Sequence, residues 1–199
     1  MERPQLHISI EGFDGVGKTT ACEKLAKLLN LEFVEKPLCS LFDSSEDYLK
    51  VRDRVNEWPE RNFTAAFYGI GSLYMYHKYA GKRIVTDRHL CSNYAWSGSD
   101  DNDDIYNLLI SKMGKPQLTV VLYADANTVK DRLSCRDVND SDLKKLDKLG
   151  HIYERMREFC VSRELRTLWL HTERYSKEDV PMLISEYFYS ENLPNFKEI

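Results

Sequence analysis

LHISIEGFDGVGKTT, residues 6–20, is the stretch of the sequence that decides the fold. Its apolar run at 6–11 predicts a buried β-strand, and the next residues, GFDGVGKT, match G-x-x-x-x-G-K-[ST] at every fixed position. Apolar residues then recur at helical spacing over 18–30, where Asn30 suits a C-terminal cap. This strand, loop and helix predict a P-loop, in which backbone N–H groups surround phosphate oxygens.

Each part of the loop has a chemical role. The glycines let the main chain bend so that its amides converge, and the helix that follows contributes its positive end. A lysine at position 18 reaches the β- and γ-phosphates, and a threonine hydroxyl at position 19 is a magnesium ligand. We therefore expect ATP with Mg²⁺ to be bound by Gly12, Gly15, Val16, Gly17, Lys18, Thr19 and Thr20.

Strands and helices alternate along the rest of the chain. Short apolar runs predict strands at 32–35, 82–87, 119–125 and 166–172, and helical spacing predicts helices at 59–80, 126–135, 141–163 and 176–190. Near-continuous apolar strands separated by helices indicate a parallel sheet with both faces covered. We expect one α/β domain over residues 1–199 with the P-loop NTPase fold and a five-stranded parallel sheet.

The composition excludes several classes of protein. Hydrophobic residues make up 42% of the chain and charged residues 30%, as in a globular enzyme. The net charge of −4 argues against a nucleic-acid partner, since proteins that bind nucleic acids are usually basic. No run approaches the ~20 apolar residues of a membrane span. The five cysteines include no C-x-x-C pair, so we expect reduced thiols and a cytoplasmic protein with no membrane partner.

A second motif occurs at residues 83–98, RIVTDRHLCSNYAWSG. A β-rich apolar run that ends in Asp87 has the layout of a strand whose carboxylate holds magnesium, directly or through water. Arg88 follows at once, and a guanidinium there can bind phosphate in a bidentate manner. The chain lacks the N-K-x-D sequence with which a GTPase reads guanine, and a small chain with a P-loop favours a kinase of a small metabolite.

Four segments together resemble thymidylate kinase and its relatives among the nucleoside and nucleotide kinases. EGFDGVGKTT (11–20) is similar to that family's E-G-x-[DE]-G-x-G-K-[ST]-T, and DRHLCSNYAWSG (87–98) to D-R-[YH]-x-x-S-x-x-A-[YF]-x-G. Residues 63–85 and 118–136 resemble the helix before the Asp-Arg strand and the entry to a lid. The resemblance implies transfer of the γ-phosphoryl group of ATP to a nucleoside 5′-monophosphate, with dTMP converted to dTDP.

The same resemblance implies roles for single residues. Asp14 would accept the 3′-hydroxyl of the acceptor sugar, Arg88 would bind the acceptor phosphate, and Ser92 would lie in the acceptor pocket. Lys18, Asp87 and Arg88 are the implied catalytic groups at the phosphates, with Thr19 and Asp87 holding the metal.

The charge of the transition state would be neutralised from a lid at about 136–148, because Gly15 stands where some relatives have an arginine. Arg132 and Arg136 are the candidates for this role, since they lie one helical turn apart and therefore on one face.

Recognition of the acceptor departs from the family pattern. Either Phe63 or Phe67 would stack on the base, yet the arginine expected four residues later is replaced by Phe67 or Gly71. The family's R-E-P becomes E-K-P at 35–37, where Lys36 can replace the arginine only as a point charge. The glutamine common before the last glycine of the second motif is Ser97.

Other interpretations of the function stay open. A deoxynucleoside kinase would need a base for the 5′-hydroxyl, for which Glu35 is the candidate, and a kinase of a modified nucleotide would suit an altered pocket. A regulatory protein that binds ATP without transferring phosphate is the non-catalytic alternative. Relatives form homodimers through helices beside the sheet, and the aromatic helix at 63–80 could form such an interface.

Overall fold

The structure is a computed structural model, and it describes residues 3–35, 37–190 and 194–199. Its parallel strands form one sheet in the order β2-β3-β1-β4-β5-β6. The strands are β1 Leu6–Glu11, β2 Glu32–Glu35, β3 Arg83–Asp87, β4 Leu118–Tyr123, β5 Thr167–His171 and β6 Phe196–Glu198.

The prediction of a parallel sheet is confirmed, but the predicted number of five strands is wrong, because β6 adds a sixth strand at one edge. It pairs with β5, where the Thr167 N–H donates to Asn195 O over 2.7 Å and the Ile199 N–H donates to Trp169 O over 2.9 Å. The segment F-K-E at 196–198 has no apolar run, so its extended conformation depends on the neighbouring strand and not on its own sequence.

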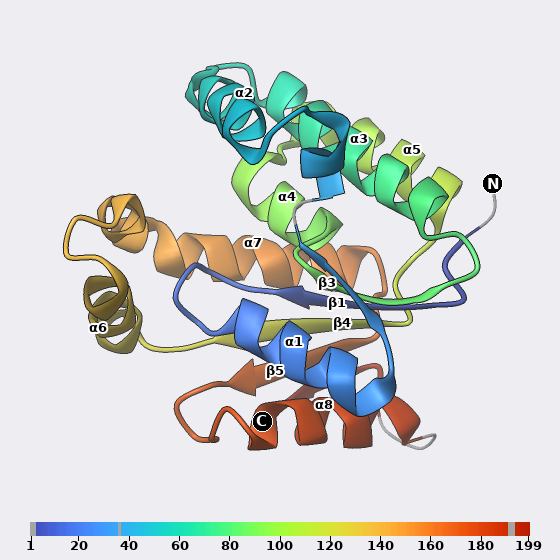
Figure 1. Ribbon diagram of the computed structural model, residues 1–199, viewed down its shortest axis with the longest axis vertical. Helices are drawn as coiled ribbons and strands as arrows, with labels where there is room; N and C mark the ends of the chain where they lie inside the picture. Colours follow the sequence, from blue (N-terminus) through green and yellow to red (C-terminus); the bar gives the residue numbers. More distant parts are fainter. Residues whose placement is uncertain (1–2, 36, 191–193) are drawn as a thin grey trace.

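Helices cover both faces of the sheet. Figure 1 shows α1 (Lys18–Leu29) and α8 (Asp179–Tyr189) on one face. The other face carries α3 (Arg61–Lys78), α4 (Leu90–Ser97), α5 (Asp103–Met113) and α7 (Leu149–Ser162) (Figure 1). Helix α2 (Ser45–Glu57) packs on α3, and α6 (Ala126–Arg136) lies beside the end of the sheet from which the loop after β1 emerges.

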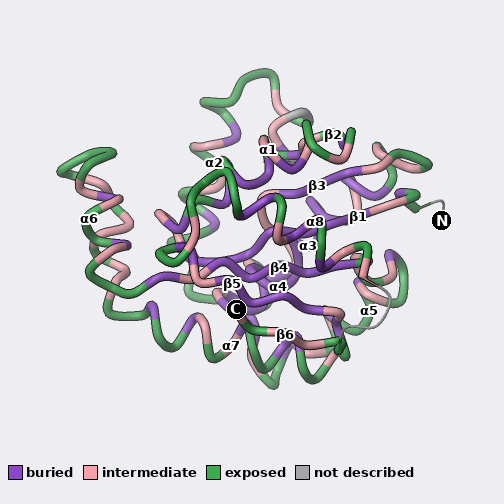
Figure 2. Tube along the Cα trace, turned by 90° about the horizontal axis from the view of Figure 1, so that it is seen from below, coloured by how far each residue is buried: buried purple, intermediate pink, exposed green. Residues whose placement is uncertain are grey.

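The buried strands explain why the sheet forms. Ile8 and Ile10 on β1, Val120 on β4 and Leu168 on β5 are fully buried, which continuous helical cover on both faces requires. Figure 2 shows the central strands as the most continuously buried part of the chain. Because every strand pair is parallel, the carboxyl ends of the strands meet at one edge, where ligands bind in open α/β sheets.

Several predicted helices have different bounds in the structure. The helix predicted at 59–80 begins at Arg61 and ends at Lys78. The helix predicted over 141–163 consists of a 3₁₀ segment, Ser141–Lys148, followed by α7. The 3₁₀ segment buries none of its residues and its start is capped by the Asp140 carboxylate, which accepts the Asp142 N–H over 2.9 Å. A local polar contact therefore begins the segment, and Leu143 and Leu146 pack half-buried against the edge of the core.

Helix α2 has no counterpart among the predicted elements. Its charged sequence, SEDYLKVRDRVNE, buries only Tyr48 and Val55, so it lacks a strong apolar period. The Ser44 side chain caps it by accepting the Asp47 N–H over 3.1 Å. Shorter 3₁₀ segments occur at Pro37–Leu41 and Asp100–Asn102. Among the described residues, no helix has the combination of length and apolar character that crossing a bilayer requires.

Candidate active site

The loop between β1 and α1 lies at the carboxyl edge of the sheet and has the backbone of a phosphate cradle. Gly12 has φ 136°, and a Cβ there would lie 2.3 Å from Leu122 O, so only glycine fits. Gly17 is the N-cap of α1 with φ 94°, and no side chain caps the helix. The first N–H groups of α1 are therefore left for an anion, at the positive end of the helix.

Lys18 is held inside this loop. Its side chain is only 6% exposed, its Nζ donates to Phe13 O over 2.8 Å, and it lies 3.7 Å from the Asp14 carboxylate. Burial lowers the pKa of Lys18 to about 8, an effect that the neighbouring Arg88 reinforces and Asp14 opposes. An ammonium in this position lacks the solvent it would find at the surface, so a phosphate is a favourable partner for it.

Thr19 and Asp87 meet across the two motifs. The Thr19 hydroxyl donates to Asp87 Oδ2 over 2.7 Å. Asp87 ends β3, which pairs with β1 so that Ile10 lies opposite Asp87. A hydroxyl and a carboxylate side by side are the hard oxygen donors that Mg²⁺ prefers, so the donor set fits this ion.

Arg88 faces the phosphate loop from β3. Its guanidinium donates to Asp14 Oδ1 over 2.6 Å and to Gly12 O over 2.9 Å. The backbone of Arg88 has φ 77°, a conformation that costs a non-glycine residue about 1–3 kcal/mol and that occurs most often at functional sites. Burial would raise the pKa of Asp14, but the charges of Arg88 and Lys18 outweigh it and hold that pKa well below its usual range.

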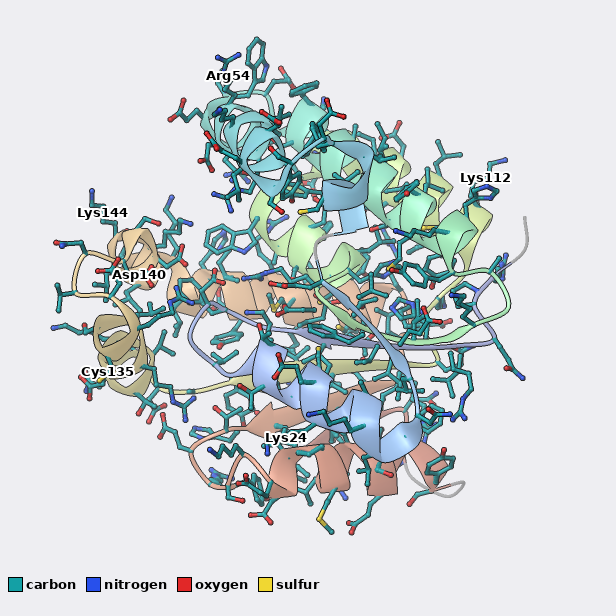
Figure 3. The ribbon with its side chains drawn as sticks, viewed as in Figure 1. Lys24, Arg54, Lys112, Cys135, Asp140 and Lys144 are labelled. Carbon is teal, nitrogen blue, oxygen red and sulfur yellow. The ribbon has the colours of Figure 1, made fainter. Side chains whose placement is uncertain are left out.

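The two arginines predicted at the lid have separate partners. Arg132 donates to Thr172 Oγ1 over 2.9 Å, which ties α6 to the end of β5. Arg136 is paired with Asp140 and lies 3.4 Å from Asp142. The segment that joins α6 to α7, on which Figure 3 labels Asp140 and Lys144, is thus fastened by its own charges.

The same segment contributes a cation that the sequence pattern did not single out. Lys145 pairs with Asp142 over 2.7 Å, and its Nζ lies 5.7 Å from the centre of the Trp96 ring. Trp96 packs on Phe13 of the loop with a ring separation of 5.7 Å. The charge of Lys145 is also close enough to Asp14 to lower the pKa of that carboxyl. A lysine in a polar segment has no distinguishing signal in the sequence, because only the tertiary structure places it beside Trp96.

The aromatic candidates for base stacking lie on α3. Phe63 is 48% exposed and packs on Trp58, while Phe67 is half-buried and its ring lies 5.2 Å from that of Tyr68. Tyr68 in turn donates to Asn56 over 2.7 Å, which joins α3 to α2.

Ser92 and Lys36 are the other residues predicted to bind the acceptor. Ser92 is buried at the start of α4, where its Oγ donates to Glu11 over 2.5 Å and lies 3.4 Å from Arg88 NH1. Lys36 lies outside the described residues.

A pocket of ≈ 240 Å³ opens beside the phosphate loop. Val16 and Thr20, near the start of α1, line it together with Arg132, Thr172 and Tyr175. Tyr175 belongs to the connection between β5 and α8, which no sequence motif links to the site. The pocket continues from the predicted phosphate cradle and could hold the rest of a nucleotide whose phosphates lie there.

A second group of metal-binding side chains lies away from Thr19 and Asp87. Asp125, His171 and Glu173 bring one potential ligand atom each within 4.8 Å of one another. The Glu173 carboxylate already accepts the Asp125 N–H over 2.8 Å, at the start of α6. This exposed group is therefore explained by the end of a helix, and it does not replace the oxygen donors of the two motifs.

Comparison with known proteins gives one consistent result. The family model for thymidylate kinase matches residues 10–184. The thymidylate kinase of Nautilia profundicola is 25% identical over 194 residues, which cover 92% of this chain and 98% of that protein. The thymidylate kinase of Mesomycoplasma hyopneumoniae is 27% identical over 170 residues, which cover 76% of this chain and 80% of that protein.

Solved structures share the fold. Deoxyadenosine kinase from M. mycoides with bound dCTP is similar with a TM-score of 0.60 and 18% identity, over 91% of this chain and 98% of that one. The YorR protein of Bacillus subtilis, in complex with phosphorylated GDP, has a TM-score of 0.54 and 20% identity, over 90% of this chain and 94% of that one. The expected P-loop kinase fold is thereby confirmed.

The buried ammonium of Lys18 makes stability depend on pH. Its pKa is about 8 in the folded chain against an ordinary 10.5, so the folded chain binds fewer protons than the unfolded chain between these values. The free energy of unfolding of the unliganded protein should rise with pH through this window, by up to about 3 kcal/mol. Lys18→Met removes this titration, so its stability relative to the natural chain should be highest near pH 7.

Urea denaturation at pH 7 and at pH 10 measures this difference. Lys144→Met, at an exposed lysine of the 3₁₀ segment, is the matched control and should show no such dependence. If the free energies of unfolding of Lys18→Met and the natural chain differ by the same amount at both pH values, burial of the Lys18 ammonium is not the cause.

Proposed function

The chain belongs to the thymidylate kinase family, and from this premise we propose that it transfers the γ-phosphoryl group of ATP to a nucleoside 5′-monophosphate, with dTMP as the acceptor. The observation that carries the proposal is the meeting of two motifs at one edge of the sheet. Arg88 and Asp87, from the end of β3, contact Asp14 and Thr19, from the loop and helix after β1. This arrangement suits phosphoryl transfer, in which catalysis consists of positioning and neutralisation of charge.

The donor side uses the P-loop. We assign the triphosphate of ATP to the amides of residues 12–19 and to Lys18, whose buried ammonium beside the loop supports the assignment. Mg²⁺ would be held by Thr19 and Asp87, and when bound it supplies positive charge to the phosphate oxygens. The pocket beside the loop, lined by Arg132, Thr172 and Tyr175 among others, is large enough to receive the nucleoside of ATP.

The acceptor side centres on Arg88. A monophosphate is already a nucleophile at neutral pH, so it needs an electrostatic partner more than a base. We assign Arg88 to the acceptor phosphate, Asp14 to the 3′-hydroxyl of its sugar, and Ser92 to the wall of its pocket. Lys36 and one of Phe63 and Phe67 remain candidates for contacts with the acceptor phosphate and base, respectively.

The acceptor is tested by measuring ADP formation with MgATP and a panel of nucleosides and their monophosphates. We expect dTMP to be phosphorylated at least about 10-fold faster than thymidine, because Arg88 is placed to bind an acceptor phosphate that thymidine lacks. A preference for thymidine would favour a deoxynucleoside kinase. The specific feature for that alternative is Glu35, which lies opposite Asp87 at the same edge of the sheet.

Lys18→Ala is the control for the donor site. It should lower turnover by about 10³-fold or more with the fold intact, since it removes the cation nearest the transferred charge. Near-normal turnover in this variant would contradict the proposed site, and tight ATP binding without transfer to any acceptor would favour the regulatory alternative.

We also propose that residues 1–199 form a single kinase domain whose segment at 136–148 acts as a lid. A lid that closes over ATP excludes water and so limits hydrolysis. Arg136 is occupied by Asp140 and Asp142, whereas Lys145 lies near Trp96 and Asp14. These contacts support Lys145, beside the predicted Arg132 and Arg136, as a lid cation that reaches the phosphates.

Replacement of Lys145 tests this assignment. Lys145→Ala should lower kcat by about 10–100-fold, because it removes a positive charge from the transition state and not from the fold. Lys144→Ala is the matched control, since this neighbouring lysine is exposed (Figure 3). Equal values of kcat for the two variants in the ADP assay would exclude the role.

The homodimer expected from the family is supported by exposed apolar side chains on two neighbouring helices. Phe63 and Ile70 of α3 are 48% and 56% exposed and lie seven residues apart, on one helix face, and Leu108 of the adjacent α5 is 58% exposed. If this surface joins two copies, Ile70→Glu should convert dimer to monomer in size-exclusion chromatography with light scattering. Met182→Glu, at a methionine of α8 that is 54% exposed, should leave the molecular mass unchanged.

The expected cytoplasmic location remains part of the proposal. The five cysteines are all free in the structure, which suits a reducing compartment. Cell fractionation would test this location, and recovery outside the cytoplasm would contradict it.

A further inference from the structure

Glu11 is a fully buried carboxylate at the junction of β1 and the phosphate loop. It is the last residue of β1, directly before Gly12, and its exposed fraction is 0%. Its Oε2 atom accepts three hydrogen bonds, from the His89 N–H over 3.2 Å, the Ser92 N–H over 3.1 Å and the Ser92 hydroxyl over 2.5 Å. All three donors belong to the segment that follows Arg88.

These bonds replace a cap that α4 lacks. His89 is the N-cap residue of α4, and its side chain makes no capping hydrogen bond. The first N–H groups of a helix need acceptors, which an aspartate, asparagine, serine or threonine at the N-cap usually provides. Glu11 provides the acceptor from a different strand, 81 positions from Ser92. It therefore fastens the start of α4 to the start of the phosphate loop.

Arg88 lies between β3 and the start of α4, the helix end that Glu11 holds. Its N–H donates to Ile10 O over 2.9 Å, and its guanidinium donates to Gly12 O over 2.9 Å. Glu11 stands between Ile10 and Gly12 in the sequence and holds the residues that follow Arg88. The left-handed backbone of Arg88 is thus bounded on both sides by contacts to 10–12, as a strained conformation requires if it is to persist.

We propose that Glu11 is a positioning residue for the kinase reaction, whose carboxylate holds the Arg88 segment (residues 87–92) against the phosphate loop before the substrates bind. Glu11 touches no substrate in this role, and it acts through the direction of the Arg88 guanidinium. The inference rests on the proposed function, because Arg88 is there assigned to the acceptor phosphate.

The expected kinetic effect distinguishes positioning from support of the fold in general. Glu11→Leu keeps most of the side-chain volume and removes the acceptor of all three hydrogen bonds, so the residues that follow Arg88 lose their attachment to the phosphate loop. We expect kcat to fall by about 100-fold while the KM for ATP changes less than about threefold, since a misplacement of about 1 Å can have this effect on the chemical step.

Glu11→Gln, which keeps an acceptor oxygen, should preserve most of the activity. The Oε1 atom has no hydrogen-bond partner among the described residues, and a cavity of ≈ 10 Å³, about the size of one water molecule, is lined by Glu11 and His89. In Glu11→Gln the amide oxygen can take the place of Oε2 while the NH₂ group takes that of Oε1. Its kcat should therefore lie within about 10-fold of the natural value, closer than that of Glu11→Leu.

A second measurement needs no substrate. In Glu11→Leu the amide protons of His89 and Ser92 lose their acceptor, so hydrogen exchange at these two positions should be at least about 10-fold faster than in the natural chain. Thr119→Val is the matched control. It alters a buried hydroxyl of β4 that lines the same cavity and whose only hydrogen-bonded side chain among the described residues is Ser9. It should leave both the exchange and kcat unchanged.

Each outcome decides the proposal. It is overturned if folded Glu11→Leu keeps kcat within threefold, if kcat and ATP affinity fall by the same factor, or if Glu11→Gln is as impaired as Glu11→Leu. Should Glu11→Leu not fold, Glu11→Asp, whose shorter side chain withdraws the carboxylate, must show the same loss of kcat. Failure of the natural chain to phosphorylate dTMP would contradict the proposed function, whereas unchanged exchange at 89 and 92 would contradict the positioning alone.

Discussion

The parallel pairing of β1 with β3 places Ile10 opposite Asp87, and the rest of the site depends on this register. It brings the end of one strand, with the phosphate loop that follows, beside the end of another, with its Asp-Arg pair. A shift of one residue would turn the Asp87 side chain to the other face of the sheet and break its contact with Thr19. Fully buried residues on both strands resist such a shift, because it would disrupt their close packing against the helices on the two faces.

Charge is the second organising feature of this edge of the sheet. Two cations, Lys18 and Arg88, face the loop, and the carboxylate of Asp14 pairs with both of them. The free protein therefore balances its own charges where the substrates would bring negative phosphates. The lowered pKa values of Lys18 and Asp14 have different causes, burial for the amine and neighbouring cations for the carboxyl. Anion binding can thus replace internal ion pairs without large movement of the backbone.

The proposed donor side is better defined than the proposed acceptor side. The loop, α1 and the adjacent pocket form a continuous surface, and the segment before α7 is held by the Arg136–Asp140 pair close to it. On the proposed acceptor side, the departures from the family pattern fall on α3, on Ser97 of α4 and at the end of β2, while Arg88 contacts both Ser92 and Asp14. Preservation of the contacts proposed to bind phosphate, beside changes at the positions proposed to bind the base, agrees with phosphoryl transfer as the reaction.

The sequence by itself determined the phosphate loop and the alternation of strands and helices, because both depend on contiguous residues: glycines that permit left-handed backbone, and apolar runs of fixed period. It did not reveal β6, the 3₁₀ segment before α7, or the contacts of Lys145 and Tyr175, whose local patterns are weak or polar. Only the tertiary structure decided that Glu11 would cap α4, a contact between residues 81 positions apart. Such contacts follow from strand register and helix packing, which arise from the summed burial of the whole core and not from any short stretch of the chain.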